Sequence, residues 1–211
     1  MKNKLLIIGA SGHGKVVADI ALKMNKWQSI AFLDDDKSIK SSMDLEVIGT
    51  SEDVFTHINE YEIFVGIGNN TTRQRIHEML ETIDASIPVL IHPNAVIGNQ
   101  VEIENGTVVM AGVVVNCCTK IGKSCIINTG STIDHDSCIK DYVHISPGAH
   151  LAGTVKVGQG SWLGIGSVVS NNISIISRCI VGAGSVVVKD ILESGTYVGV
   201  PARKIGKKFH F

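Results

Sequence analysis

The chain has 211 residues, of which 44% are hydrophobic, and its net charge is −1. This charge gives no electrostatic reason to expect nucleic acid or a membrane surface as a partner, and no apolar run reaches the length of a membrane span. Residues 2–8 lead directly into a glycine-rich loop, unlike a signal peptide, so we expect a cytoplasmic protein. The length allows two hydrophobic cores, and we expect domains at residues 1–88 and 89–211.

The first predicted element is a buried parallel strand at residues 4–8, followed by the segment GASGHGKVV at residues 9–17. Apolar residues at helical spacing over residues 16–24 place these glycines at a strand-to-helix turn. The backbone N–H groups of such a turn suit a phosphate, here at Gly12, Gly14 and Lys15. Because Val16 stands where a hydroxyl would hold magnesium, ATP hydrolysis is not expected. A tight turn without a ligand is the alternative.

A second strand, residues 30–33, ends in three consecutive acidic residues, 34–36. In a Rossmann-like fold, an acid about twenty residues beyond the glycine loop binds a ribose hydroxyl. Asp34 and Asp35 are therefore candidates for nucleotide binding, with a solvated acidic turn as the alternative reading.

A third strand, residues 62–67, leads into Gly68 and Asn69, which we also assign to the nucleotide site. A helix of about a dozen residues follows, with Asn70 as its expected N-cap and Arg73 near the expected position of an anion. Residues 1–88 are thus predicted to form a three- or four-stranded α/β, Rossmann-like domain that binds a nucleotide.

From Ile91 to Val186 an aliphatic residue recurs every six positions without insertion or deletion, and a small or β-branched residue usually follows it four places later. This period is typical of a parallel β-helix, in which each block is one short strand and one corner. Three blocks make a coil of eighteen residues, and successive coils rise roughly 4.8 Å, the spacing of neighbouring strands. A sandwich of ordinary strands would need turn signals at longer or irregular spacing.

The five cysteines all lie in this repeat and show no paired metal-ligand spacing, so no metal site is predicted. Cys125 and Cys179 occupy the small inward position, which favours core filling over chemistry.

His135 lies between Asp134 and Asp136, two places after an inward aliphatic, where side chains should face outward. Neighbouring carboxylates stabilise an imidazolium and should make this histidine more basic. Adding eighteen residues places Gly153 one coil above His135. A glycine there leaves room for a thioester and offers a backbone N–H as an oxyanion donor.

The joint presence of GASGHGKVV, a DDD turn, GIGNN, DHD and HISPGAHLAG resembles the sugar acetyltransferases of the sialic acid O-acetyltransferase and bacillosamine N-acetyltransferase type, over essentially the whole chain. The resemblance implies an all-β left-handed β-helix, a homotrimer with active sites between subunits, and acetyl-CoA as co-substrate. It also implies acetylation of the 4-amino group of a nucleotide-linked, UDP-type amino sugar in bacterial surface-glycan or glycoprotein-glycan synthesis.

In this family the catalytic pair is a histidine followed by an acid, which matches His135 and Asp136, although the acid is often glutamate. The resemblance assigns contacts with the nucleotide sugar to His13 and Asn128. It assigns the acetyl end and the groove of coenzyme A to further positions, namely His144, Gly153, Ile165 and Ala183.

The remaining features are less specific. His57, His77 and His210 are expected on the surface, and His92 and His150 match no role. Residues 196–203 resemble the loop that closes many hexapeptide acyltransferases, and we expect them to cover the last coil.

Three other functions stay open. These are a sialic acid-type O-acetyltransferase, a zinc hydratase with three converging histidines, and a non-catalytic platform that only binds a nucleotide sugar.

Overall fold

The computed structural model describes residues 2–206, and the contacts within the chain divide it between Pro93 and Asn94 into two units. No helix within the described residues is long and apolar enough to cross a bilayer. The elements of the N-terminal unit are β1 Lys4–Ile8, α1 Gly12–Met24, β2 Ser29–Leu33, β3 Ser41–Ser42, β4 Leu45–Gly49, a 3₁₀ turn Ser51–Asp53, α2 Val54–His57, β5 Tyr61–Val65, α3 Asn70–Thr82 and β6 Leu90–Ile91.

The N-terminal unit is an α/β domain built on a five-stranded sheet in the order β3-β4-β2-β1-β5. The central strands β1, β2 and β5 pair in parallel and are almost wholly buried, which explains their continuous apolar sequences. The prediction of three or four strands was too low, because β3 and β4 form a short antiparallel pair at one edge. Alternate residues of β4 are exposed, so its sequence lacks an apolar run.

Three local predictions in this unit are corrected by the structure. Helix α1 begins at Gly12, so residues 12–15 form its first turn. The N-cap of α3 is Asn69, whose side chain accepts a hydrogen bond from the Thr72 N–H, and Asn70 is the first helical residue. The predicted surface position of His77 is wrong, since it is fully buried on the inner side of α3. The same prediction for His210 falls outside the described residues.

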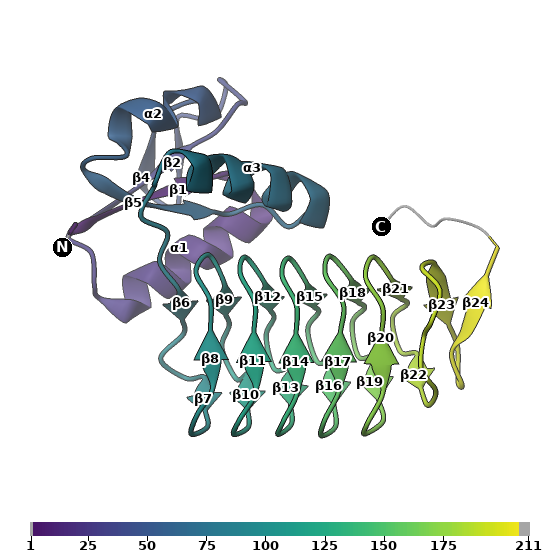
Figure 1. Ribbon diagram of the computed structural model, residues 1–211. Helices are drawn as coiled ribbons and strands as arrows, with labels where there is room; N and C mark the ends of the chain where they lie inside the picture. Colours follow the sequence, from purple (N-terminus) through teal and green to yellow (C-terminus); the bar gives the residue numbers. More distant parts are fainter. Residues whose placement is uncertain (1, 207–211) are drawn as a thin grey trace. The chain divides into compact units, whose positions relative to one another are not determined.

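The C-terminal unit is a parallel β-helix of two-residue strands that recur every six residues (Figure 1), as the repeat predicted. Its strands are β7 Val96–Ile97, β8 Glu102–Ile103, β9 Val108–Val109, β10 Val114–Val115, β11 Lys120–Ile121, β12 Ile126–Ile127, β13 Thr132–Ile133, β14 Cys138–Ile139, β15 His144–Ile145, β16 His150–Leu151, β17 Lys156–Val157, β18 Trp162–Leu163, β19 Val168–Val169, β20 Ser174–Ile175, β21 Ile180–Val181, β22 Val186–Val187, β23 Thr196–Val198 and β24 Arg203–Ile205.

The strands of the coil form three faces, and each strand from β7 to β19 pairs with the one eighteen residues further on. Face 1 contains β9, β12, β15, β18 and β21. Face 2 contains β7, β10, β13, β16, β19 and β22, and face 3 contains β8, β11, β14, β17 and β20. The pairing runs without a register shift through the coil, so residues eighteen apart lie one above the other.

The interior of the coil is filled by the second residue of most strands and by the small residue at each corner. Cys125 and Cys179 have no exposed surface, as expected for core filling. The small hydroxyl residues also satisfy the backbone, because Thr107 Oγ1 accepts from Cys125 N–H at 2.9 Å and donates to Gly122 O at 2.7 Å. A Cβ at Gly122 would lie 2.8 Å from the Asp141 nitrogen, so close packing requires this glycine.

The last coil is covered by a hairpin. Strand β23 pairs in parallel with β21, and β24 pairs antiparallel with β23. Residues 196–205 therefore protect the edge that β21 would otherwise leave open, in agreement with the prediction for this segment.

Candidate active site

The His135 corner, residues 134–137, is the turn where the chain passes from face 2 to face 3. Asp134 Oδ1 accepts hydrogen bonds at 2.8 Å from the His135 backbone N–H and from Asn116 Nδ2 of the adjacent coil. Asp136 has a left-handed backbone with φ 56°, which aspartate tolerates better than most residues. Its Oδ2 lies 2.7 Å from His135 Nδ1. The predicted pair of His135 and Asp136 is thus in direct contact.

These contacts make His135 a stronger base. The hydrogen bond to Asp136 and, next, the charge of Asp134 raise the pKa of the imidazole above its ordinary value. Because Nδ1 donates its proton to the carboxylate, Nε2 carries the lone pair of the neutral ring. The side chain is 52% exposed, so the ring is open to solvent. Such an arrangement can serve as a general base with an orienting carboxylate.

Gly153 lies one coil above His135 and touches its ring. The Thr154 N–H donates to His135 O at 2.8 Å, which continues the ladder through this corner. A Cβ at Gly153 would lie 2.7 Å from His135 Nε2 and 2.8 Å from Cε1. The sequence predicted that the space left by this glycine holds a thioester. In the structure the imidazole of His135 occupies that space.

A second cluster lies on face 1 around His144. Asn128 Nδ2 is 3.1 Å from His144 Nε2. The His144 ring stacks on Trp162 of the next coil, with ring centroids 5.6 Å apart and planes 5° from parallel. Trp162 Nε1 donates to Ser146 Oγ at 2.6 Å. No role was predicted for Trp162, although the eighteen-residue step from His144 leads to it.

The two further residues assigned to the coenzyme groove lie near this second cluster. Ile165 and Ala183 are one coil apart at the corner where face 1 passes into face 2, and both are exposed. Asn128 lies at the beginning of the same corner. The predicted coenzyme residues therefore form two groups, because Gly153 lies at the His135 corner and face 2 separates that corner from the others.

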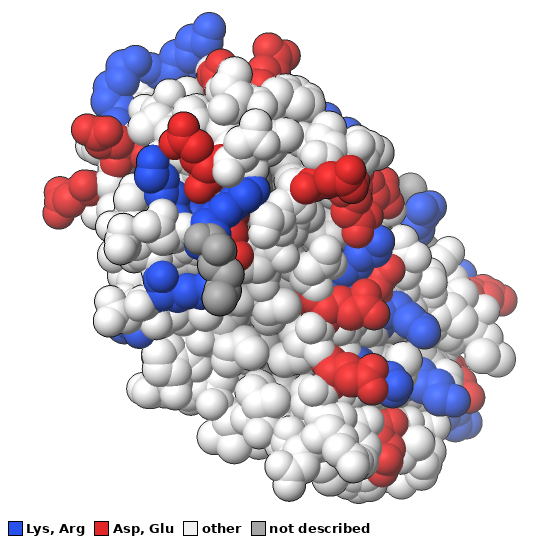
Figure 2. Space-filling model, turned by 60° about the vertical axis from the view of Figure 1, so that its left-hand side comes forward, with Lys and Arg blue, Asp and Glu red and all other residues white. Residues whose placement is uncertain are grey.

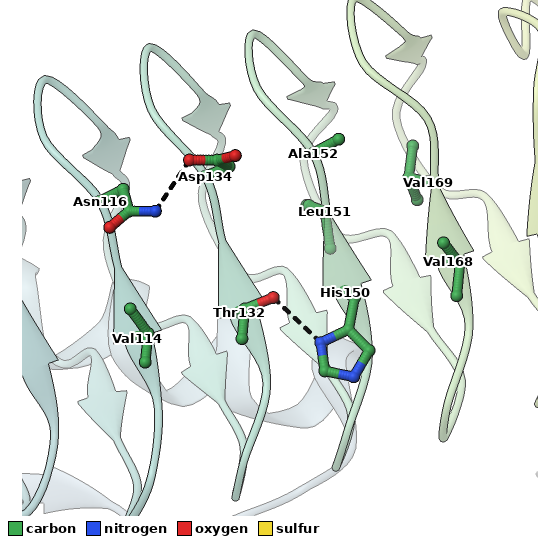
Figure 3. Close-up of a pocket in the computed structure, with 9 residues that line it drawn as sticks. All are labelled: Val114, Asn116, Thr132, Asp134, His150, Leu151, Ala152, Val168 and Val169. Atoms are coloured by element: carbon green, nitrogen blue, oxygen red, sulfur yellow. Dashed lines mark hydrogen bonds between the residues drawn. The ribbon is translucent and has the colours of Figure 1, made fainter.

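Face 2 carries a surface hollow of about 430 Å³ (Figure 3). Its lining comes from four neighbouring strands and contains one charged residue, Asp134. His150, which had no predicted role, points outward here, and its Nδ1 lies 2.9 Å from Thr132 Oγ1. In Figure 2, a stripe of charged side chains of both signs borders a wide surface without charges.

The predicted nucleotide residues of the N-terminal unit gather at the carboxyl ends of β1, β2 and β5. A Cβ at Gly14 would lie 1.9 Å from Gly9 O, so the turn that contains Gly12 and Lys15 requires this glycine. Asp34 Oδ2 accepts from Ala10 N–H at 2.7 Å and ties the glycine loop to β2.

The other acidic candidate, Asp35, also has a partner within its unit. Its Oδ1 accepts from Ser51 N–H at 2.9 Å, and this hydrogen bond is the first cause that lowers the pKa of Asp35. Gly68, from the loop after β5, approaches the glycine loop, because a Cβ added to it would lie 3.9 Å from His13 Cβ.

Arg73 organises the loop between β5 and α3. Its guanidinium is buried and donates to Ile67 O at 3.2 Å, Gly68 O at 2.9 Å and Asn70 Oδ1 at 2.8 Å. Burial and, next, the charge of Arg73 lower the pKa of His13 to about 4, so His13 is neutral at pH 7. Within residues 2–206, His13 Nε2 is buried without a hydrogen-bond partner.

Comparison with known proteins connects these two units to one group of enzymes. Residues 4–80 match the family model described as the PglD N-terminal domain. The structure of the acetyltransferase domain of PglB from Neisseria gonorrhoeae FA1090 has 38% sequence identity and a TM-score of 0.94 over 97% of this chain and 100% of that one. The same domain has also been solved in complex with acetyl coenzyme A.

Two further relatives are named as perosamine N-acetyltransferases. A perosamine N-acetyltransferase from Caulobacter crescentus, solved with CoA and GDP-perosamine, has 34% identity and a TM-score of 0.92 over 97% of both chains. GDP-perosamine N-acetyltransferase from Escherichia coli O157:H7 is 28% identical over 183 residues, which are 84% of this chain and 82% of that protein. The chain therefore belongs to the PglD family of hexapeptide-repeat sugar N-acetyltransferases, and it is an acyltransferase.

Proposed function

We propose that this protein transfers the acetyl group of acetyl-CoA to the 4-amino group of a nucleoside-diphosphate-linked 4-amino-dideoxy sugar, with a UDP-linked sugar as the first candidate. The observation that carries the proposal is the contact of His135 with Asp136 on one side and Gly153 on the other. In the proposed reaction these residues would supply a base, its orienting group and a backbone N–H close together.

In the proposed reaction the sugar amine attacks the thioester carbonyl carbon, and His135 Nε2 accepts the proton that the amine loses. Asp136 keeps the other ring nitrogen protonated and stabilises the imidazolium. The Gly153 N–H donates to the oxyanion of the tetrahedral intermediate. When the carbon–sulfur bond breaks, the proton on His135 passes to the departing thiolate, so the enzyme returns to its starting state.

The N-terminal unit would hold the nucleotide of the acceptor. The first turn of α1, with Gly12, Gly14 and Lys15, presents backbone N–H groups for a diphosphate. Neutral His13 and the loop tied by Arg73 line the same edge of the sheet. Asp35 remains the acidic candidate for the ribose, because both oxygens of Asp34 already accept backbone N–H groups.

We further propose a homotrimer with an active site between neighbouring chains. His135 and Gly153 lie at one corner of the coil, whereas His144 lies on face 1, so one chain does not present both groups to a small acetyl group. The weakly charged face 2 is suited to burial against another copy of the chain. The His135 corner of one chain would then meet face 1 of its neighbour.

Thiol release from acetyl-CoA tests this function directly. The acceptors are a UDP-linked 4-amino sugar, GDP-perosamine, free sialic acid and no acceptor. We expect release with a nucleotide-linked amine, and His135→Gln should lower kcat by roughly 10²- to 10⁴-fold, the usual contribution of a general base. Thiol release with sialic acid alone would instead show O-acetylation. No thiol release with any acceptor would favour a platform that only binds a nucleotide sugar.

A further inference from the structure

The side-chain amide of Asn128 has a defined orientation. Its Oδ1 accepts a hydrogen bond from the Thr129 backbone N–H at 2.8 Å. A backbone N–H is only a donor, so the oxygen and not the NH₂ group must face it. The NH₂ group of Asn128 is therefore the group that lies 3.1 Å from His144 Nε2.

This orientation determines which nitrogen of His144 carries the proton. An NH₂ group is a donor, so the ring nitrogen that faces it must be an acceptor. Nε2 of His144 therefore holds a lone pair, and the proton of the neutral ring lies on Nδ1. A second proton on Nε2 would place two donors against each other, so this contact favours the neutral ring.

The plane of the ring is fixed as well. His144 lies flat against Trp162, with ring planes only 5° from parallel. Trp162 is itself held by the bond from Nε1 to Ser146 Oγ, and Ser146 is buried. Rotation of the His144 ring would break both the stack and the bond to Asn128. These residues come from neighbouring coils of face 1 and form one connected group.

We propose that Asn128 is a positioning residue that holds His144 as the neutral Nδ1–H tautomer, so that the ring presents one fixed hydrogen-bond donor to the carbonyl oxygen of the bound thioester. The proposal rests on the proposed acetyl transfer. A donor held in place before the reaction stabilises developing negative charge without reorganisation, and a neutral imidazole can fill this role. The role differs from the sugar contact that the resemblance implied for Asn128.

The tautomer can be measured in the full-length protein labelled with ¹⁵N-histidine. Long-range ¹H–¹⁵N spectra distinguish protonated from unprotonated ring nitrogens, and the loss of signals in His144→Gln assigns them. We expect Nε2 of His144 to be unprotonated at neutral pH. In Asn128→Asp a carboxylate replaces the donor, so the proton should move onto Nε2. A proton on Nε2 in the unmodified protein would overturn the proposal.

Kinetics distinguish positioning from a sugar contact. Asn128→Ala removes the amide and frees the His144 ring to take the other tautomer, so kcat/KM for acetyl-CoA should fall by roughly 2- to 10-fold, the usual loss of one hydrogen bond, with the KM of the acceptor unchanged. Asn105→Ala is the matched control, because it removes the same side chain at another exposed corner of the coil. A thermal melt checks that both variants fold. A change confined to the acceptor KM would refute the positioning role in favour of the sugar contact.

A failure of the proposed function is visible separately. If no amine is acetylated, the thioester contact is wrong, whereas the NMR spectra still decide whether Asn128 sets the tautomer of His144.

Discussion

The contact between Gly153 and His135 permits a quantitative prediction for Gly153→Ala. The new Cβ would lie 2.7 Å from Nε2, and unstrained contacts between such atoms begin near 3.5 Å, so the ring must move by about 0.8 Å. The bond from Nδ1 to Asp136 Oδ2, at 2.7 Å, opposes that movement. Because a misplacement of about 1 Å can cost about 10²-fold, we expect kcat to fall roughly 10- to 100-fold.

The assay is acetyl-CoA-dependent thiol release at saturating acceptor, together with a thermal melt. The ring is half exposed and can turn outward, so the free energy of unfolding should change by less than about 1 kcal/mol. Gly206→Ala is the control, because nothing lies within 4 Å of its added Cβ. Unchanged kcat in Gly153→Ala, or a loss that only follows the amount of unfolded protein, would refute the reasoning.

Two other substitutions probe the two halves of the site. Asp136→Asn removes the first cause of the raised pKa of His135. The base works unprotonated, so its activity is lost as the pH falls through that pKa, and the acid limb of kcat/KM against pH should move to lower pH in this variant. An acid limb at the same pH in both proteins would contradict the role of Asp136. Arg73→Met leaves the carbonyls of Ile67 and Gly68 without this donor, so we expect unfolding to become easier by about 2 to 4 kcal/mol and the KM of the nucleotide sugar to rise with that of acetyl-CoA unchanged. Arg73→Lys should show a smaller effect on both, and an equal rise in both KM values would contradict a role confined to the nucleotide loop.

The coil could be predicted from the sequence because one short rule governs it. An inward aliphatic every sixth residue specifies the strand, and an uninterrupted register makes neighbours of residues eighteen apart. That arithmetic alone is sufficient to place Gly153 beside His135. The reason for the glycine was not predictable, because it depends on which way the imidazole turns at its corner.

The features that were missed depend on side-chain direction or on tertiary context. Helical periodicity identifies α3, yet it did not show that Arg73 turns toward the preceding loop or that His77 faces inward. The strand β4 lies at a sheet edge with alternate residues exposed, so its apolar signal is weak. The amide of Asn128 is oriented by a backbone N–H, and no spacing rule in the sequence specifies such a contact.

The separation of His135 from His144 within one chain predicts the outcome of mixing two impaired variants. If each site combines the His135 corner of one chain with face 1 of its neighbour, equal mixing of His135→Gln and His144→Gln chains should restore some sites. Such a site is intact when the chain that supplies the corner keeps His135 and the neighbour that supplies face 1 keeps His144.

Whichever variant is present twice in a mixed trimer, this occurs at about one in three of its sites, so about a third of the normal activity should return. The chains are mixed by co-expression with two affinity tags, and mixed trimers are isolated before thiol release is measured. The control pairs two differently tagged His135→Gln chains, which leave no intact corner in any arrangement. Because a site contained in one chain regains nothing from either mixture, recovery in the first mixture alone requires that neighbouring chains share the active site.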